Sequence, residues 1–264
     1  MNRVVIVASH RRSGTHLALD SLRMNALDLD PRFMTLERIE PGHPKHLPVR
    51  EFQRRLQSRA GTVLVKTHAL PGRASWESDE TGSYAEQLLQ NWPSVYVHRD
   101  GRDVLVSLYH FVASYAPSVA AQTFGEFIRA EGSAVDAIGI SRAAYWQRHV
   151  LAWLGHDPVA TASFERMRLD FPGAMADLAS HLGLQLRSSL SPVLLEERGG
   201  PRWMRAVRRA LARAGLASGP RSTAIRPLSG TSGSWRVAFD EDDLAWFENQ
   251  ASEAMRRLGY ADSR

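Results

Sequence analysis

The feature that most constrains this chain is a short apolar run near its amino terminus that leads directly into a loop of small and basic residues. Residues 3–8 read Arg-Val-Val-Ile-Val-Ala, a β-branched run typical of a buried strand. The loop Ser-His-Arg-Arg-Ser-Gly-Thr-His follows at residues 9–16, and residues 14–27 then show a helical spacing of leucines. This order is typical of anion binding, because loop N–H groups and the positive end of the helix point at one place. The stretch therefore predicts a phosphate-binding loop, with a simple turn carrying solvated arginines as the alternative.

The composition is that of an ordinary folded protein with a basic surface. The 264 residues suit one α/β domain, and 44% hydrophobic with 23% charged residues excludes a largely disordered chain. A formal net charge of +5 favours anionic partners such as nucleotides, sulfated compounds, nucleic acid or an acidic membrane. The lack of cysteine excludes disulfides and cysteine chemistry. No signal-peptide core or run of roughly 20 apolar residues is present, so a cytoplasmic location is the default expectation.

Two further strand-like runs, residues 62–66 and 94–98, each end in polar residues, and residues 158–162 form a weaker fourth strand. Residues 28–48 contain four prolines and are expected to be an irregular surface crossing. The repeated order of strand, loop and helix predicts a three-layer α/β fold, in which a mostly parallel central sheet is flanked by helices. Helices are expected at residues 14–27, 50–59, 84–91, 104–115, 124–129, 141–154, 171–182 and 240–258.

Polar residues at the ends of these strands are expected to meet at one edge of the sheet, where ligands bind in open α/β folds. Lys66 and His68 follow the second strand, and Arg99 follows the third, with Ser107 in the next helix. The first loop lacks the glycine-lysine-serine/threonine ending of ATP-hydrolysing P-loops, because Thr15 stands where the lysine would be. A P-loop nucleotide kinase or other phosphotransferase nevertheless stays open as an alternative function.

Three segments, in this order, resemble motifs of the sulfotransferases that use 3′-phosphoadenosine 5′-phosphosulfate (PAPS). Residues 12–17, Arg-Ser-Gly-Thr-His-Leu, resemble the 5′-phosphosulfate loop, and residues 66–68, Lys-Thr-His, resemble the lysine-threonine-histidine segment. Residues 99–111 resemble the 3′-phosphate-binding segment, and residues 145–153, 164–167 and 230–236 show weaker likenesses. The resemblance implies one sulfotransferase-like domain over residues 1–264, with a P-loop-like phosphosulfate loop and residues 186–235 as a cap over the cofactor and acceptor site.

The resemblance also implies a role for each residue. His68 would be the general base, since a neutral imidazole can take the acceptor's proton near pH 7, although an isolated histidine is more commonly structural. Lys66 and Arg12 would stabilise charge on the sulfuryl group and the departing phosphate of PAPS without a metal ion, leaving 3′-phosphoadenosine 5′-phosphate (PAP). The predicted catalytic residues are His68, Lys66 and Arg12. The predicted cofactor-binding residues are Arg11, Arg12, Ser13, Gly14, Thr15, His16, Leu17, Arg99, Ser107, Phe164, Arg226, Gly230, Gly233 and Trp235.

Several positions depart from the family pattern. Leu17 stands where the family generally has an adenine-stacking tryptophan, and Phe164 stands where tyrosine is frequent. The family usually has an arginine-lysine pair before the first glycine of the cap, and here Leu228 and Ser229 stand in its place. Arg226 and Arg236 are the candidates to supply the missing positive charge. For Arg99 the alternative is a surface ion pair with one of the aspartates that follow it.

The pocket that binds the acceptor is expected to be formed by the loops at residues 28–48, 71–83 and 186–223. The expected acceptor is a small molecule, a glycan or a lipid-linked compound. Residues 202–213 are expected to form a basic amphipathic helix, which favours a glycan, lipid-linked or otherwise amphipathic acceptor over a small phenol and suggests peripheral contact with a membrane surface. A solvated arginine face is the alternative for this helix, and a non-catalytic basic module that binds acidic glycan or lipid is the alternative for the protein. No motif for reading nucleic acid is present, and the oligomeric state is undetermined.

Overall fold

Five parallel strands form the centre of the molecule. The computed structural model describes residues 3–132, 139–157, 159–193 and 232–261, and within them the strand order is β2-β3-β1-β4-β5. Every neighbouring pair is parallel, so the predicted α/β class with a mostly parallel sheet is confirmed. The strands are β1 (Val4–Ser9), β2 (Met34–Thr35), β3 (Val63–Thr67), β4 (Ser94–His98) and β5 (Val159–Ser163).

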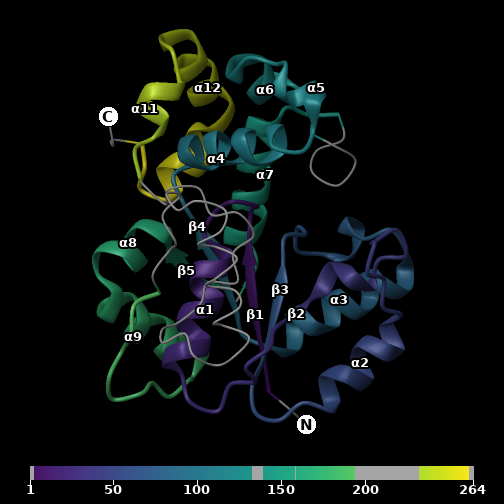
Figure 1. Ribbon diagram of the computed structural model, residues 1–264. Coiled ribbons are helices and arrows are strands. Elements are labelled where there is room, and N and C mark those ends of the chain that lie inside the picture. Colours follow the sequence, from purple (N-terminus) through teal and green to yellow (C-terminus); the bar gives the residue numbers. More distant parts are fainter. Residues whose placement is uncertain (1–2, 133–138, 158, 194–231, 262–264) are drawn as a thin grey trace, which may run out of the picture.

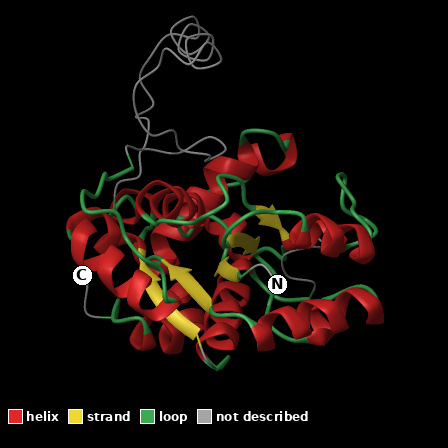
Figure 2. Ribbon diagram, turned by 90° about the horizontal axis from the view of Figure 1, so that it is seen from below, coloured by secondary structure: helices red, strands yellow, loops and turns green. Residues whose placement is uncertain are grey.

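Helices flank the sheet on both sides, as the view from below in Figure 2 shows. In Figure 1, α8 and α9 lie beside α1, α2 and α3 lie on the side of β2, and α4, α6, α11 and α12 lie together in the upper part. The helices are α1 (Thr15–Asn25), α2 (Val49–Gln57), α3 (Asp79–Asn91), α4 (Gly101–Ala113), α5 (Pro117–Ala120), α6 (Phe124–Arg129), α7 (Arg142–Leu154), α8 (Phe164–Leu169), α9 (Phe171–Leu182), α11 (Trp235–Ala238) and α12 (Glu241–Arg257), with 3-10 helices η1 (Leu36–Ile39) and η2 (Arg73–Ser75).

The apolar core lies in two layers, one on each face of the sheet, because successive strand side chains point in opposite directions. Val4 and Ile6 of β1 belong to the layer that packs against α2, α3, α4, α7 and α12. Val5 and Val7 belong to the other layer, which packs against α1, α8 and α9. Burial on both faces explains why the strands read as continuous apolar runs in the sequence.

Capping residues set several of the helix ends. The Ser78 hydroxyl accepts the backbone N–H of Thr81 at the start of α3, and the Asp240 carboxylate accepts that of Asp243 at the start of α12. Gly183 ends α9 in the left-handed conformation, with φ 55°. These ends agree with the sequence-based expectation for α9 and α12, whereas α3 begins five residues before the expected position at residue 84.

The expectation for residues 28–48 is wrong in one respect. They contain β2 and η1, and Met34, Leu36 and Ile39 are buried in the core rather than on the surface. Thr35 pairs with Lys66 at the edge of the sheet. A strand of two residues is too short to show an alternating pattern, which is why the prolines around it dominate the sequence signal. The predicted cap at residues 186–235 falls mostly in 194–231, outside the described residues, as does the basic helix at 202–213.

The strand order determines where the three predicted loops lie. β1 has β3 on one side and β4 on the other, so the chain leaves the carboxyl ends of these three strands at adjacent positions. A ligand site is expected at this edge, where the strand order reverses. Among the helices that the structure describes, none has the length and apolar character needed to cross a membrane.

Candidate active site

The loop after β1 has the backbone geometry of an anion-binding turn. Arg12 and Gly14 have positive φ angles of 70° and 98°, and the Ser13 N–H donates to the His10 carbonyl at 3.3 Å. Gly14 is the N-cap of α1, and a Cβ added there would lie 2.6 Å from Cδ2 of Phe164. A side chain at this position would collide with the ring, so glycine lets the loop pack closely against it. The first N–H groups of α1 lie next to this loop.

His16 lies close to basic groups, and Leu17 lies in the apolar core. His16 is half-buried against Phe33, with ring centroids 5.7 Å apart. Burial, followed by the charges of Lys66 and Arg12, lowers the pKa of His16 to about 4, so its imidazole is neutral at pH 7. The side chain of Leu17 lies in the apolar layer beneath α1 and is only 2% exposed. Its contact with adenine stays a prediction.

The remaining loop residues are also placed by the structure. Ser13 and Thr15 are buried, and the Thr15 hydroxyl is hydrogen-bonded to the hydroxyl of Ser9. Arg11 is half-buried, and its charge is close enough to lower the pKa of His68. The loop therefore presents backbone donors and two arginines at the end of β1.

His68 turns from the end of β3 towards β1. Its Nδ1 lies 2.8 Å from the carbonyl oxygen of Ser9, so Nδ1 carries the proton and Nε2 carries the lone pair. Burial, followed by the charge of Lys66, lowers the pKa of His68 well below its ordinary value, and Arg11 and His149 act in the same direction. The imidazole is therefore neutral at pH 7 and can accept a proton at Nε2.

Lys66 precedes this histidine on the same strand and is half-buried. Burial lowers the pKa of Lys66 below its ordinary value, while Glu37 opposes this shift and Arg11 adds to it. An ammonium that has lost part of its hydration interacts strongly with a nearby anion. Lys66 therefore supplies positive charge beside His68 and His16.

Arg12 links the first predicted segment to the third. Its Nε donates to the hydroxyl of Ser107 on α4 at 3.1 Å, and its guanidinium lies 4.8 Å from the centre of the Phe111 ring. The two residues are separated by more than ninety positions in the sequence, and the fold places them in direct contact. The resemblance assigns them to opposite ends of one nucleotide, so this contact supports a single site.

Arg99 lies at the end of β4 over the ring of Phe164. Its guanidinium carbon is 4.7 Å from the ring centre, and its Nη2 is 3.7 Å from Oδ2 of Asp103. Arg99 is 6% exposed and Asp103 is 1% exposed. An ion pair with Asp103 therefore exists, but it is buried and not on the surface as the alternative reading expects.

The predicted cap residues fall into two groups. Gly233 and Trp235 lie next to the start of α4, because their backbone N–H groups donate to the carboxylate of Asp103 at 2.7 and 3.1 Å. The ring of Trp235 is covered by the guanidinium of Arg102, 3.9 Å from the ring centre. Arg226 and Gly230 lie outside the described residues.

Two acidic residues that the sequence analysis did not single out organise this site. Oε1 of Glu37 accepts hydrogen bonds from the Thr67 hydroxyl at 2.9 Å, the Ala69 N–H at 3.2 Å and the His68 N–H. Asp103 holds the start of the 232–238 segment, including the hydroxyl of Ser234 at 2.7 Å. Glu37 carries no signal in the sequence, because it lies in a proline-rich stretch, whereas Asp103 lies within the segment 99–111, where the resemblance points to Arg99 and Ser107 as the phosphate-binding residues.

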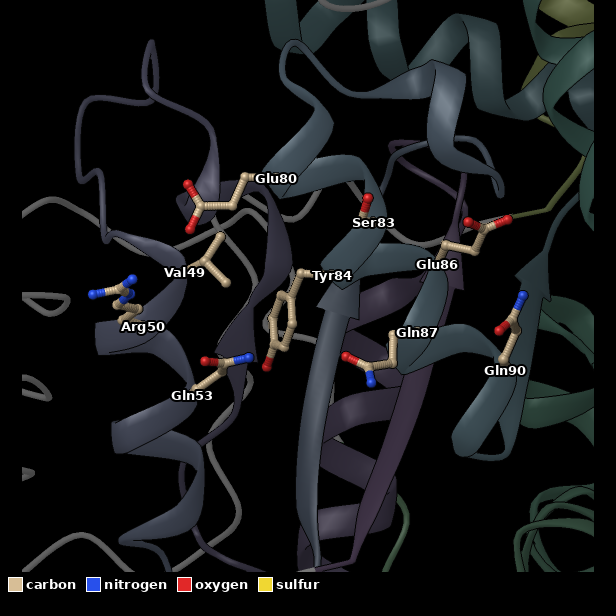
Figure 3. A pocket seen from close by; sticks show the side chains of 9 residues that line it. All are labelled: Val49, Arg50, Gln53, Glu80, Ser83, Tyr84, Glu86, Gln87 and Gln90. Atoms are coloured by element: carbon tan, nitrogen blue, oxygen red, sulfur yellow. The ribbon is translucent and has the colours of Figure 1, made fainter.

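A separate cavity of about 530 Å³ lies between α2 and α3 (Figure 3). Its walls combine polar side chains with the apolar surface of residues such as Val49 and Tyr84, and none of the predicted site residues contributes to them. It therefore lies apart from the site at the strand ends. The lining residues are Val49, Arg50, Gln53, Glu80, Ser83, Tyr84, Glu86, Gln87 and Gln90.

Comparison with known families decides the class of protein. A family model described as "Sulfotransferase domain" matches residues 2–259, nearly the whole chain. The chain belongs to the sulfotransferase family. This membership confirms the predicted family and the prediction that the protein is an enzyme of the sulfotransferase class. It also leaves no observation in favour of a P-loop kinase or a non-catalytic basic module.

Solved structures share the fold of this sulfotransferase. A mouse sulfotransferase, SULT7A1, complexed with PAP is 18% identical with a TM-score of 0.60, and the match covers 99% of this chain and 86% of that one. Retinol dehydratase in a complex with retinol and PAP is 20% identical with a TM-score of 0.51, covering 97% and 82%. A sulfotransferase from Alicyclobacillus acidocaldarius is 12% identical with a TM-score of 0.51, covering 82% and 94%. A search of curated proteins found no match.

Proposed function

We propose that this sulfotransferase transfers the sulfuryl group of PAPS to a hydroxyl or amine of a small acceptor, with His68 as general base. The observation that carries the proposal is the bond from His68 Nδ1 to the Ser9 carbonyl, which leaves Nε2 as the proton acceptor. The same bond ties the base to the strand that leads into the phosphate-binding loop. This bond supports a site in which proton acceptance and phosphate binding share one edge of the sheet.

The residues present fit a nucleotide that carries phosphates at both ends. Gly14 and the first turn of α1 suit the 5′ side, where backbone N–H groups and the helix dipole stabilise an anion. Arg99 and Ser107 suit a 3′-phosphate, because a guanidinium offers a planar fork for phosphate oxygens. The PAP bound in the mouse sulfotransferase and in retinol dehydratase is consistent with this fit. When bound, PAPS supplies the activated sulfuryl group.

The protein's own side chains would accept the proton and stabilise the negative charge during transfer. His68 would accept the proton of the attacking hydroxyl at Nε2, because its pKa keeps the ring neutral at pH 7. Lys66 and Arg12 would stabilise the negative charge that develops on the transferring group and the departing phosphate. Both positive charges lie in partly buried positions, where electrostatic stabilisation is stronger than in water.

For the acceptor we propose a small molecule with a hydroxyl on an apolar framework. Retinol dehydratase is complexed with retinol in one solved structure and with androsterone in another. The half-buried ring of Phe111 next to Arg12 provides apolar surface close to the site. Glycan and lipid-linked acceptors remain in the panel below, because the sequence predicts a basic amphipathic helix at 202–213.

The test uses ³⁵S-labelled PAPS with a panel of acceptors: 2-naphthol, androsterone, an oligosaccharide, a lipid-linked sugar and a primary alkyl amine. We expect transfer to at least one of them and a loss of about 10²- to 10⁴-fold in kcat for His68→Ala, the range for general-base removal. PAP binding, measured by calorimetry, should persist in this variant.

The matched control is His181→Ala, which removes an exposed histidine on α9. It should leave both kcat and PAP binding unchanged. Undiminished activity in His68→Ala would contradict the role of His68, and preference for magnesium-ATP over PAP in the wild type would contradict the donor.

A further inference from the structure

The backbone around His68 is held by side chains on both of its edges. The N–H groups of His68 and Ala69 both donate to Oε1 of Glu37. The carbonyl of His68 lies 3.0 Å from Nε2 of His149, and the carbonyl of Ala69 accepts from Nε1 of Trp153 at 3.0 Å. All four backbone polar groups of the two residues are therefore bonded to side chains.

The three side chains come from opposite sides of the site. Glu37 belongs to η1, directly after β2, whereas His149 and Trp153 belong to α7. The two α7 residues are four positions apart, so they lie on the same face of the helix, one turn apart. This spacing matches their bonds to two consecutive carbonyls. His149 and Trp153 are completely buried, which excludes water as a competing partner.

We propose that Glu37, His149 and Trp153, here called the His68 clamp, are positioning residues that orient the His68 imidazole for proton acceptance. The inference rests on the proposed role of His68 as the base. Nδ1 of His68 lies 2.8 Å from the Ser9 carbonyl while the 68–69 peptide is held in this position, so the direction of the ring is tied to the backbone that carries it. Release of one carbonyl would free the loop to turn and move Nε2 away from the acceptor.

Tyr96 completes the arrangement by setting the tautomer of His149. Its hydroxyl lies 3.0 Å from Nδ1 of His149. Because Nε2 of His149 must carry the proton that it donates to His68, Nδ1 must accept, and the tyrosine hydroxyl is the donor. The ring of His149 also packs edge-on against that of His10, the residue after Ser9, with ring centroids 5.4 Å apart. The clamp therefore contacts the phosphate-binding loop at His10 as well as through the bond from His68 to the Ser9 carbonyl.

A pair of substitutions at His149 separates hydrogen bonding from size. His149→Gln can place its amide nitrogen where Nε2 lies, and it retains the donor to the His68 carbonyl. His149→Asn places its amide near the position of Nδ1 and cannot reach that carbonyl. We expect kcat to fall about 10- to 100-fold in His149→Asn, as for other small displacements of a reacting group, and only a few-fold in His149→Gln. The dissociation constant of PAP should stay within about twofold in both variants, because the clamp does not touch the phosphate sites.

Two hydroxyl deletions provide a gentler test and its control. Tyr96→Phe keeps the ring and removes the hydroxyl that sets the His149 tautomer, so kcat should fall while PAP binding is retained. Tyr84→Phe is the matched control, because the Tyr84 hydroxyl is also buried but has no hydrogen-bond partner among the described residues. Tyr84 lines the separate cavity in Figure 3, so this variant should behave as the wild type.

Amide hydrogen exchange gives a readout that does not require activity. Exchange in a peptide covering residues 66–70 should be faster in His149→Asn and Tyr96→Phe than in His149→Gln, Tyr84→Phe or the wild type. Measurements are made on the full chain, with 2-naphthol or the fastest panel acceptor for kcat. The far-ultraviolet circular dichroism and Tm of each variant show whether it is folded. If His149→Asn does not fold, Tyr96→Phe takes its place as the test of the clamp.

The outcomes separate the two hypotheses. The clamp is supported if kcat and exchange change together in the donor-deficient variants. It is overturned if His149→Asn and Tyr96→Phe keep wild-type kcat and exchange, or if His149→Gln loses as much as His149→Asn. A wild type that transfers no sulfuryl group would instead contradict the proposed function, and the exchange measurement would then decide alone whether the clamp holds this backbone.

Discussion

Nη2 of Arg99 lies 3.7 Å from Oδ2 of Asp103, and both residues are almost completely buried at the start of α4. The same carboxylate accepts hydrogen bonds from residues 233–235. Asp103 therefore stands between the arginine proposed to hold the 3′-phosphate and the segment that precedes α11. The contact of Asp103 with Arg99 and its contacts with residues 233–235 can therefore be tested by separate substitutions.

Arg99→Ala should weaken binding of PAP but not binding of adenosine 5′-monophosphate, which lacks the 3′-phosphate. Loss of a charge-assisted hydrogen bond predicts an effect of about 10- to 100-fold on the dissociation constant of PAP. Calorimetry with both nucleotides measures the difference. Arg99→Lys, which keeps the charge without the planar fork, should show a smaller loss. Equal losses for both nucleotides would contradict the assignment of Arg99 to the 3′-phosphate.

Asp103→Asn should loosen the segment at residues 232–238. The substituted amide nitrogen would face the N–H of Gly233 or that of Trp235, so one of these donors would lose its acceptor. An unsatisfied buried group costs about 1–3 kcal/mol, which should lower the free energy of unfolding by that amount. Hydrogen exchange of this segment and urea unfolding measure the two effects. Asp79→Asn is the control, because Asp79 is 94% exposed and should tolerate the change.

The pH dependence of kcat should be flat near neutrality. His68 acts in its neutral form, and its lowered pKa places the acid limb well below pH 6.5. Lys66 acts in its charged form, and its lowered pKa places the loss of activity on the alkaline side below pH 10.5. Initial rates at saturating PAPS and acceptor, from pH 5 upward, measure both limbs. A rising limb centred at pH 6.5 or above would contradict the buried environment of His68.

Acid should destabilise the folded protein through its buried histidines. Burial lowers the pKa of His10 to about 3 and those of His16, His98 and His149 to about 4. Below pH 6.5 the unfolded chain gains protons on these residues that the folded protein does not bind, so stability falls as the pH falls towards 4. The slope is up to about 1.4 kcal/mol per histidine and pH unit. Calorimetric Tm values from pH 8 to pH 4.5 measure it.

The variant His98→Gln provides the comparison for this slope. It removes one titrating group, so its Tm should depend less steeply on pH in the same window. A Tm that stays constant from pH 6.5 to 4.5 in the wild type would show that these histidines are protonated in the folded state.

Most of the fold follows from local signals. The runs at 62–66 and 94–98 match β3 and β4 within one residue at each end, and the helix expected at 141–154 matches α7 within one residue. By contrast, β2 and α8 were not expected, because two residues cannot show a strand period and six residues give little helical pattern. The resemblance points to Lys66, His68 and Arg99, which the structure places at the ends of β3 and β4, while their roles stay predictions. It assigned no role to Asp103, although this residue lies within the segment 99–111, and Glu37 lies outside every motif.

The sequence by itself determined the strand, loop and helix order, the basic and histidine residues at three strand ends, and the family to which the chain belongs. These features depend on patterns within about ten residues and on the order of short motifs. The tertiary structure decided which atoms meet: Nδ1 of His68 with the Ser9 carbonyl, Nε of Arg12 with Ser107, and Glu37 with the backbone of His68. These contacts join residues from 31 to 95 positions apart, and only packing of the sheet and its helices brings them within hydrogen-bond distance.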